Sequence, residues 1–455
     1  MKSDFVKTLN FLKKNGPVKT FWAIRERLEE KKKPAYRYEG ISHEERLNQV
    51  GFLENSILFS ILVPSYETKP EYMKGLIDSV RNQTYNRWEL IIADASSTSA
   101  VEDVVGQYAD DRIKYHRLEK NFGISGNTNE GLKFCKGDYI ALLDHDDLLT
   151  QQALFENAAR IRYFKDDGIE LQMLYSDEDK TDSENTMFFE PNIKPGFNLD
   201  LILSNNYICH FLVIKAELMK ELGLRSEFDG AQDHDLILRV VSRLIHRETK
   251  TDSPGRIPVT FEKYIHHIPE VLYHWRCHEA STAANPKSKL YAYESGKRAV
   301  QDFLDREGIK GKAVDLPHMG FFEIEYEEEI LKARPDVGAV GFRIIGKNNR
   351  VTGGIFDENM NIMFEGLNVH YSGGYLHRAA CFEDVFGVDI RSMLPCDRGI
   401  EVLGRIMKKQ ENPDSQNFLE ISREFSDTMK NEGYRLLYNP KITVKEKNLP
   451  GQDGI

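Results

Sequence analysis

Apolar residues between positions 57 and 175 recur with two different periods, and the two periods alternate along the chain. Short apolar runs that end at polar residues or proline predict strands, and apolar residues spaced three and four apart predict helices. The predicted strands cover residues 59–63, 88–93, 112–118 and 139–143, and the predicted helices cover residues 70–83, about 100–109, and a segment with Ser125 as its N-cap. Strands that alternate with helices form parallel sheets with right-handed crossovers. The pattern therefore predicts an α/β fold with a mainly parallel sheet.

The alternation becomes irregular after Tyr175, which predicts a change of architecture. The expected features, in chain order, are polar loops over 177–206, a buried apolar stretch over 201–214, a helix after residues 232–235, a loop insertion over 247–263, a strand over 270–275 and a helix near 289–307. An acidic run at 323–329 and Arg334-Pro335 predict a boundary, followed by a smaller α/β segment with Gly-rich turns. We therefore expect N-terminal helices over residues 1–50, a main domain over 51–325 and an accessory domain over 326–455.

Composition narrows the class of protein without identifying it. The 455 residues are 40% hydrophobic and 29% charged, which is typical of a globular chain. Lys plus Arg is 61 and Asp plus Glu is 72, so the net charge is 61 − 72 = −11, and no nucleic-acid partner is expected. Five widely spaced cysteines without a CxxC pair argue against a disulfide framework or a zinc site and favour a reducing compartment. Since no apolar run approaches the roughly 18–20 residues of a membrane span, a cytoplasmic protein is expected.

The first 33 residues differ in charge from the rest of the chain. They carry ten Lys or Arg against four Asp or Glu, which is 10 − 4 = +6, with aromatic and aliphatic residues at helical spacing. A basic amphipathic helix can lie on an anionic membrane surface. The alternative is that its Phe/Trp face packs on the main domain. The segment is thus a candidate for peripheral contact with the inner face of the plasma membrane.

Polar residues follow three of the predicted strands at the edge where such sheets bind ligands. They are Pro64-Ser65-Tyr66-Glu67, Asp94-Ala95-Ser96-Ser97 and Asp144-His145-Asp146-Asp147. Carboxylates at a strand end are hard ligands that suit Mg²⁺ or Mn²⁺, and the metal in turn binds phosphate. The alternative is that these residues cap the next helix. The chain has no GxxxxGK[ST] loop and no GxGxxG, so any nucleotide is held without a glycine cradle.

Several motifs in order resemble one family over about residues 57–305. They are FSILVPSYE from Phe59, LIIADASS from Leu90, Asn121-Phe122-Gly123 with Asn127 and Asn129, GDY before LLDHDD, QDHDL from Gln232, and VLYHWRCHEAST from Val271. Together they resemble the family-2 glycosyltransferases of the GT-A fold, which have a Rossmann-like mixed, mainly parallel sheet. SDED from Ser176 and PGF from Pro195 resemble members that build bacterial surface polysaccharides, O-antigens and rhamnose-containing glycans.

The resemblance assigns the nucleotide-binding residues. It implies that Asp94 accepts the N3–H of uracil or thymine. Pro64, Ser65, Tyr66 and Glu67 would then line the pocket for the base and ribose. Ala93 fills a place that is more often acidic in the family, which puts extra ribose contacts in doubt. The implied donor is a UDP- or dTDP-sugar, and Asn129 is counted among its contacts.

The resemblance also assigns the reacting centre. It implies that Asp144 holds the donor ribose or sugar and that Asp146 ligates Mg²⁺ or Mn²⁺. His278 is either a further metal or phosphate contact or a surface histidine, and Arg276 either pairs with the diphosphate or is structural. Asp233 is the expected general base, with a helix N-cap as the alternative role and Asp235 as its competitor.

The implied reaction is an inverting transfer of the sugar to a glycan or lipid-linked saccharide acceptor. Two other classes share parts of the pattern. A sugar-nucleotide nucleotidyltransferase would need a Gly-rich basic loop after the first strand, but the segment at that place, PSYETKP from Pro64, has no glycine. A catalytically inert scaffold would not need both Asp146 and Asp233. In the C-terminal region, GYRLLYNPKITV from Gly433 follows a helix as HIPEVLY from His267 does. We therefore interpret this region as a degenerate GT-A-like half without a DxD motif.

Overall fold

The computed structural model describes residues 36–52, 56–248, 256–277, 290–369, 373–409 and 418–449, together with short helical pieces between residues 8 and 25. Most of the predicted N-terminal amphipathic segment lies outside these residues, and α2 (His43–Phe52) is the first helix described in full. No helix within the described residues is long and apolar enough to cross a membrane.

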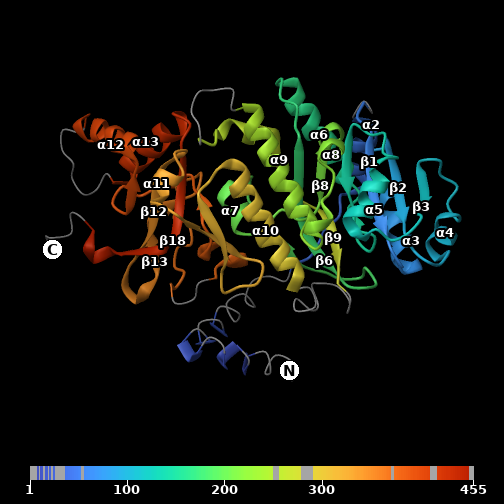
Figure 1. Ribbon diagram of the computed structural model, residues 1–455, viewed down its shortest axis with the longest axis horizontal. Helices are drawn as coiled ribbons and strands as arrows, with labels where there is room; N and C mark the ends of the chain where they lie inside the picture. Colours follow the sequence, from blue (N-terminus) through green and yellow to red (C-terminus); the bar gives the residue numbers. More distant parts are fainter. Residues whose placement is uncertain are drawn as a thin grey trace.

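The main domain is built on a nine-stranded sheet whose first half is entirely parallel. Strand order along the sheet is β3-β2-β1-β4-β8-β6-β9-β5, with β7 paired to β6. The parallel half consists of β1 (Phe59–Ser65), β2 (Trp88–Asp94), β3 (Ile113–Arg117) and β4 (Tyr139–Leu142), and the helices that connect these strands are α3 (Pro70–Arg81), α4 (Ala100–Val105) and α5 (Gly123–Leu132). The predicted α/β class with a mainly parallel sheet is thus confirmed (Figure 1).

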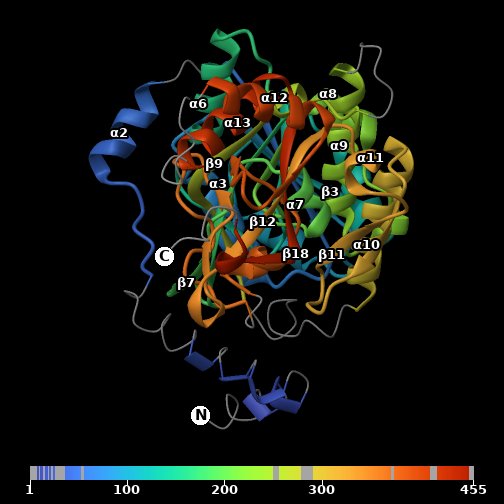
Figure 2. The ribbon, with the colours of Figure 1, turned by 90° about the vertical axis from the view of Figure 1, so that its left-hand side faces the viewer.

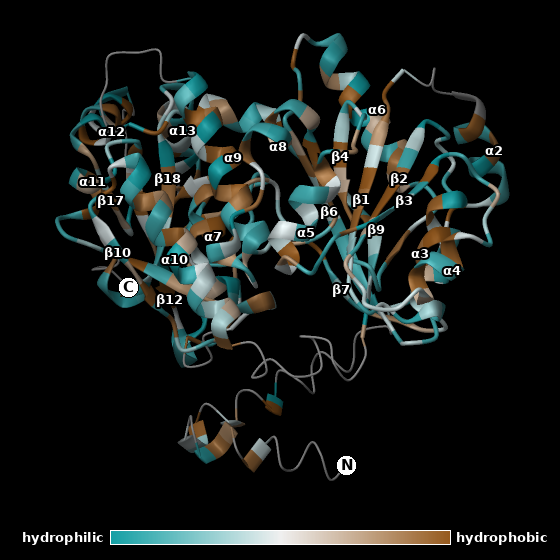
Figure 3. Cartoon of the chain, turned by 45° about the vertical axis from the view of Figure 1, so that its right-hand side comes forward, coloured by the Kyte–Doolittle hydropathy of each residue, from teal (hydrophilic) through white to brown (hydrophobic). Residues whose placement is uncertain are grey.

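Local sequence explains why this half forms. Strand β1 lies in the interior, and its run of apolar residues is buried on both faces, as is usual for a strand covered by helices. Pro70 begins α3, where its missing N–H costs nothing, and buried Tyr72, Met73, Leu76, Ile77 and Val80 form the helix face toward the sheet. In Figure 3 hydrophobic residues run along β1 and β2 inside the domain, while α4 turns hydrophilic residues outward.

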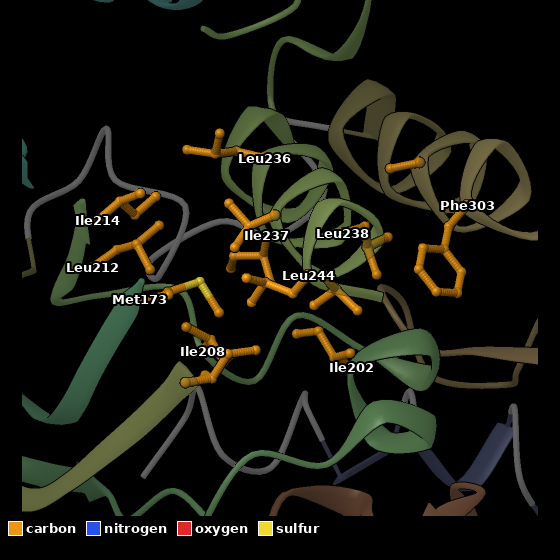
Figure 4. Packing of buried hydrophobic residues seen from close by; sticks show 14 of the residues in the cluster. Met173, Ile202, Ile208, Leu212, Ile214, Leu236, Ile237, Leu238, Leu244 and Phe303 are labelled. Atoms are coloured by element: carbon orange, nitrogen blue, oxygen red, sulfur yellow. The ribbon is translucent and has the colours of Figure 1, made fainter. Parts of the chain in front are cut away.

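The second half of the sheet is mixed, with antiparallel β8 between β4 and β6. Its elements are β5 (Leu148–Leu149), α6 (Ala153–Asp166), β6 (Met173–Thr181), β7 (Phe188–Asn192), α7 (Leu199–Ser204), β8 (Leu212–Lys215), α8 (Ala216–Leu222), α9 (Gln232–Glu248), β9 (Ile265–Arg276) and α10 (Leu290–Glu307). Figure 4 shows the core beneath α9, where Ile237 and Leu244 lie on the side of the helix toward Met173 and Ile202. The predicted apolar stretch over 201–214 is indeed buried.

Several predicted elements differ from the structure. Ser125 lies inside α5 rather than at its N-cap, which is Phe122, and the Ser125 hydroxyl donates to Asp229. Strand β6 occupies part of the predicted polar loop, because its acidic residues are buried and paired. Strand β9 begins at Ile265, five residues before the predicted start, and the part of the predicted loop insertion after residue 258 is a 3₁₀-helix.

The C-terminal region has its own five-stranded sheet, which lies beside the main domain in Figure 1 and in front of it in Figure 2. A hairpin of β10 (Gly311–Asp315) and β11 (Phe322–Tyr326) precedes it. Its elements are α11 (Ile330–Ala333), β12 (Val337–Ile345), β13 (Val351–Gly353), β14 (Ile355–Phe356), β15 (Glu383–Asp384), β16 (Gly387–Val388), β17 (Met393–Pro395), α12 (Asp397–Lys409), α13 (Phe418–Asn431) and β18 (Arg435–Lys445), of which β14 and β16 form a separate two-stranded pair.

Buried ion pairs join the two sheets. Arg334, 1% exposed, contacts both carboxylate oxygens of Asp200 on α7 at 2.7 and 3.1 Å, and it also pairs with Asp336. Arg435 at the start of β18 pairs with Glu262 of the main domain. Since these charges are buried and paired across the junction, the C-terminal region is held in a fixed position against the main domain.

Candidate functional site

The turn after β1 and the turn after β2 are joined by hydrogen bonds. The Glu67 carboxylate accepts from the backbone N–H and the hydroxyl of Ser97 at 2.8 and 2.7 Å, and the Glu67 N–H donates to the Ser96 hydroxyl. The hydrogen bond from the Ser97 backbone lowers the pKa of Glu67, so this side chain stays ionised. Tyr66, beside it, is 50% exposed at the carboxyl edge of the sheet. Pro64 and Ser65 end β1 beneath these side chains.

Asp94 lies at the end of β2 and is completely buried. One carboxylate oxygen accepts from the Ser96 hydroxyl at 2.5 Å and from the Ser96 N–H at 3.1 Å. The other accepts from the Tyr115 hydroxyl at 2.9 Å. In this arrangement Asp94 fixes the turn after β2 and ties it to β3. A base N3–H would have to replace one of these donors.

Asn129 is engaged with the backbone of another segment. Its side-chain oxygen accepts from the Leu224 N–H and its side-chain nitrogen donates to the Leu224 carbonyl, both at 2.8 Å. The structure therefore places Asn129 as a clamp between α5 and the loop after α8. This position was expected to contact the donor.

Three potential metal ligands converge after β4. Asp144, Asp147 and His210 each offer one ligand atom, and these atoms lie within 4.8 Å of one another. Asp144 is about half exposed, and its Oδ2 lies 3.6 Å from Nε2 of His210. Carboxylate oxygens with one imidazole suit Mn²⁺ and Mg²⁺ chemistry, the imidazole favouring Mn²⁺. The group differs from the predicted one, because Asp144 was expected at the sugar and Asp146 at the metal.

Asp147 is held from two sides on the buried side of this group. Its carboxylate accepts from the Tyr273 hydroxyl at 2.5 Å and from the Arg276 N–H at 2.7 Å. Burial and the neighbouring carboxylates of Asp146 and Asp144 raise the pKa of Asp147 well above its usual range. A nearby cation would reverse that effect, since it favours the ionised form.

Arg276 is buried and donates a hydrogen bond to the loop after β4. Its Nε donates to the Asp146 carbonyl at 2.5 Å, another guanidinium nitrogen donates to the Ser183 carbonyl at 2.8 Å, and the group lies over the Tyr72 ring. These contacts fit the structural role that the sequence left as one of two alternatives for Arg276. His278, the other predicted lid residue, lies outside the described residues.

A buried ion pair positions His210, a residue that the sequence did not single out. Its Nδ1 lies 3.1 Å from Glu178, and Glu178 pairs with buried Lys194 at 3.0 Å. Burial alone would raise the pKa of Glu178, but the charges of Lys194 and His210 outweigh burial and bring it to about 2. Burial would lower the pKa of His210, but Cys209 and Glu178 raise it well above its usual range.

Asp233 is the second residue of α9, and its carboxylate accepts from the Asn206 side chain at 2.7 Å. Asn206 also accepts from the Cys209 N–H at 3.2 Å, and the Cys209 sulfur lies 3.5 Å from His210 Nε2. Asp233 is therefore connected to the metal-capable group through the loop before β8. It is also half-buried, so part of its side chain can be reached from solvent.

Asp235, the competing candidate, has a different environment. It is completely buried and pairs with both Arg225 and Arg239. Arg239 also donates to the carbonyls of Leu222 and Gly223. Asp235 thus anchors the loop after α8 to α9 and does not face the group around His210.

Comparisons with known proteins found similar sequences. Residues 60–223 match the model of the family described as Glycosyl transferase family 2. The chain is 38% identical over 268 residues to the uncharacterized protein y4gI of Sinorhizobium fredii, which is 58% of this chain and 27% of that protein. It is 32% identical over 263 residues to the O-antigen biosynthesis protein RfbC of Myxococcus xanthus, covering 57% and 19% of the two chains. The chain thus spans about a quarter or less of these relatives.

Two further similarities are more limited. A stretch of 91 residues is 38% identical to UDP-Glc:alpha-D-GlcNAc-diphosphoundecaprenol beta-1,3-glucosyltransferase WfgD of Escherichia coli, covering 20% and 36% of the two chains. The crystal structure of S. aureus TarS in complex with UDP-GlcNAc has a TM-score of 0.38 and 16% identity, over 55% of this chain and 72% of that one. Residues 60–223 are thus similar to family 2 glycosyltransferases, as the motifs predict.

Proposed function

We propose that this chain is an inverting, metal-dependent glycosyltransferase of bacterial surface-polysaccharide synthesis. It moves a sugar from a UDP- or dTDP-sugar to a glycan or lipid-linked saccharide. The observation that carries the proposal is the pairing of a metal-capable group, Asp144, Asp147 and His210, with a partly exposed carboxylate, Asp233, on the adjoining loop and helix. The names of RfbC and WfgD support the polysaccharide context.

The donor end of the site binds diphosphate through a divalent cation. Asp144 and His210, with Asp147 behind them, would hold Mg²⁺ or Mn²⁺, and Asp146 is the further candidate from the sequence motif. The ion supplies neutralisation of the charge that grows on the leaving diphosphate. The chain's own contribution is orientation, because the Glu178–Lys194 pair fixes His210 and the Tyr273 hydroxyl fixes Asp147.

The nucleotide binds at the turns after β1 and β2. Exposed Tyr66 offers its ring to the base, and Glu67 and Ser97 shape the ribose side of this edge. Asp94 reads the N3–H of uracil or thymine by exchanging one of its present donors, Ser96 or Tyr115, for the base.

The acceptor hydroxyl is deprotonated by Asp233. The side-chain N–H of Asn206 donates to this carboxylate and orients it at the start of α9. A single displacement by the acceptor oxygen on the face opposite the diphosphate inverts the anomeric carbon. Asp235 takes no part, because Arg225 and Arg239 hold it in the interior.

A donor screen tests this proposal. UDP- and dTDP-sugars are incubated with the full chain and Mn²⁺, and release of nucleoside diphosphate is measured with and without EDTA. Release that needs Mn²⁺ and falls in Asp233→Asn supports the proposal. The matched control is Asp166→Asn, at an exposed position at the end of α6. Binding of a sugar nucleotide without turnover in the presence of Mn²⁺ would instead support the scaffold alternative.

The N-terminal segment places the enzyme at the inner face of the membrane in this proposal. Among its described residues Val18 and Phe21 are 58% and 60% exposed, and the segment as a whole carries the charge of +6 noted above. Removal of residues 1–33 should lower salt-sensitive binding to anionic liposomes. Equal liposome binding by the full and shortened chains would show that the segment only packs on the protein.

A further inference from the structure

The C-terminal sheet repeats the strand arrangement of the second half of the main sheet. In the main sheet β6 pairs antiparallel with β7 and β8 and parallel with β9. In the C-terminal sheet β12 pairs antiparallel with β13 and β17 and parallel with β18. The order along the chain is also the same, because α8 and α9 separate β8 from β9 as α12 and α13 separate β17 from β18.

The parallel pair of β6 and β9 contains a bulge, and the position of this bulge can be used to align the two sheets. Between Tyr175 and Glu178 the chain of β6 advances three residues. Its partner β9 advances six over the same length, from His267 to Tyr273. Pro269 lies within this bulge, where its missing N–H leaves no ladder bond unpaired.

The same irregularity occurs in the C-terminal sheet. Strand β12 advances three residues from Gly341 to Ile344, and β18 advances six from Tyr438 to Val444. Pro440 is the second residue after Tyr438, as Pro269 is the second after His267. Topology, register and proline position therefore agree, and the C-terminal sheet is a second copy of the half that carries Asp233.

The register identifies the counterparts of the site residues. Arg391 precedes β17 by two residues as His210 precedes β8. The registers of β7 and β13 supply the remaining pairs, which are Glu178 with Ile344, Asn192 with Gly353, and Lys194 with Ile355. The second copy therefore lacks the imidazole and the buried ion pair at these positions.

A cavity of about 350 Å³ lies at this equivalent position. Arg391 and Gly353, two of the counterparts just named, are among its lining residues. The other described lining residues are Thr352, Phe356, Met360, Asn361, Ile362, Glu365, Asp389 and Leu419. Asp357 shapes one wall, since its carboxylate accepts from the Asn361 N–H at 2.8 Å and from the Asn361 side chain at 3.0 Å. The copy has thus kept a cavity where it has lost the reacting groups.

The charges of the cavity favour a neutral, polar ligand. Its single cation, Arg391, is held by Asp389 through two bonds of 3.0 and 2.7 Å, and Glu365 adds a second negative charge. A nucleotide diphosphate would meet net negative charge here. Apolar side chains beside amide, hydroxyl and carboxylate groups suit the C–H faces and hydroxyls of sugars.

We propose that this cavity binds a short segment of saccharide chain without reacting with it. The choice of a saccharide rests on the proposed function, because the equivalent place in the main domain receives the acceptor. The cavity would hold the growing or acceptor glycan at a second point while its end lies at Asp233.

Direct binding measurements test the proposal on the full chain. The probes are biotinylated tetrasaccharides of glucose, N-acetylglucosamine, galactose, mannose or rhamnose, read by interferometry, with hydrogen exchange to locate the bound sugar. A Cβ at Gly353 would meet no atom closer than 3.5 Å, so Gly353→Val fits the backbone and fills the cavity. Leu419→Ala removes an apolar contact, and its control is Ile400→Ala, 58% exposed on α12 and outside the cavity.

At least one tetrasaccharide should bind and should slow hydrogen exchange over residues 351–365. Gly353→Val should raise its Kd by about tenfold and Leu419→Ala by a few-fold, with Ile400→Ala unchanged. No binding, or protection confined to residues 206–233, overturns the inference. Donor hydrolysis is measured separately. Saccharide binding in the cavity of a chain without turnover would uphold this inference while the proposed function fails.

Discussion

The two copies of the β6–β9 arrangement differ most in what they bury. In the main domain the copy buries Glu178 and Lys194 as an ion pair behind His210, whereas the C-terminal copy has Ile344 and Ile355 at those positions. Burying charge costs several kcal/mol of desolvation per ion, and an apolar replacement of similar volume is often neutral or stabilising. The charges are therefore expected where they position a reacting group, and the apolar copy shows the same scaffold without that demand.

The largest expected effect is at the general base. Asp233→Asn keeps the size and the capping ability of the side chain but removes the proton acceptor, so transfer should fall by about 10²–10⁴-fold. The KM for the donor should change little, because the metal-capable group is untouched. Steady-state kinetics with Asp166→Asn as the control measure this. Activity within a few-fold of wild type in Asp233→Asn would contradict this assignment of the base.

The second effect concerns the metal, since the one metal-capable group found among the described residues lies in the main domain. EDTA should remove turnover, and Mn²⁺ should restore it. Asp144→Asn or His210→Gln should weaken Mn²⁺ activation by about 10–100-fold or more, since each removes a ligand. Titration of Mn²⁺ against rate measures this, and Asp146→Asn in the same series decides between the sequence-predicted ligand and the group seen in the structure. Full activity of the wild type in EDTA would contradict metal dependence altogether.

The third effect compares equivalent buried positions. Lys194→Met removes one of the two cations that pair with buried Glu178, the other being His210, and should lower the free energy of unfolding by up to about 3–5 kcal/mol. Its counterpart Ile355→Val should cost only about 0.5–1.5 kcal/mol. Denaturant unfolding of both variants gives the two values. Similar costs would show that the ion pair is no more demanding than the apolar pair.

The pH dependence sharpens this third comparison. The pKa of Glu178 is lowered to about 2 from an ordinary value of 4.5. The stability from its ionisation is therefore present above pH 4.5 and lost as the pH falls toward 2. The cost of Lys194→Met should shrink over that range, whereas the cost of Ile355→Val should not.

How far the sequence predicts this molecule depends on where its polar residues lie. Strands β1, β2 and β4 are continuous apolar runs bounded by turn residues, so hydropathy alone finds them. Strand β6 was missed because Asp177, Glu178 and Asp179 read as a loop, although all three are buried and paired with His267, Lys194 and His274. Only the three-dimensional partners make such a strand stable.

The site residues also divide into those that the sequence could predict and those that it could not. Asp144, Asp146 and Asp147 follow an apolar strand directly and could be predicted as ligands. His210 could not, because its partners Asp144 and Glu178 are distant in the sequence. Asp233 and Asp235 were separated by helix geometry, since two residues turn about 200° around a helix. The backbone contacts of Asn129 could not be predicted, because a backbone partner leaves no pattern in side-chain types, and for Arg276 the sequence left a structural role as one of two alternatives.

The smallest expected effect is an attempt to make the second copy react. Leu419→Asp places a carboxylate in the lining of the C-terminal cavity, and Arg391→His places an imidazole at the position equivalent to His210. In an Asp233→Asn chain these changes should restore no turnover. The described part of the C-terminal sheet has no counterpart of β1–β4, and the carboxyl edge of those strands is where the donor binds in our proposal. Donor release by the triple variant, compared with Asp233→Asn alone, measures this. A gain above that background would show that the second copy can bind a donor, and the difference between the two copies would then be one of side chains alone.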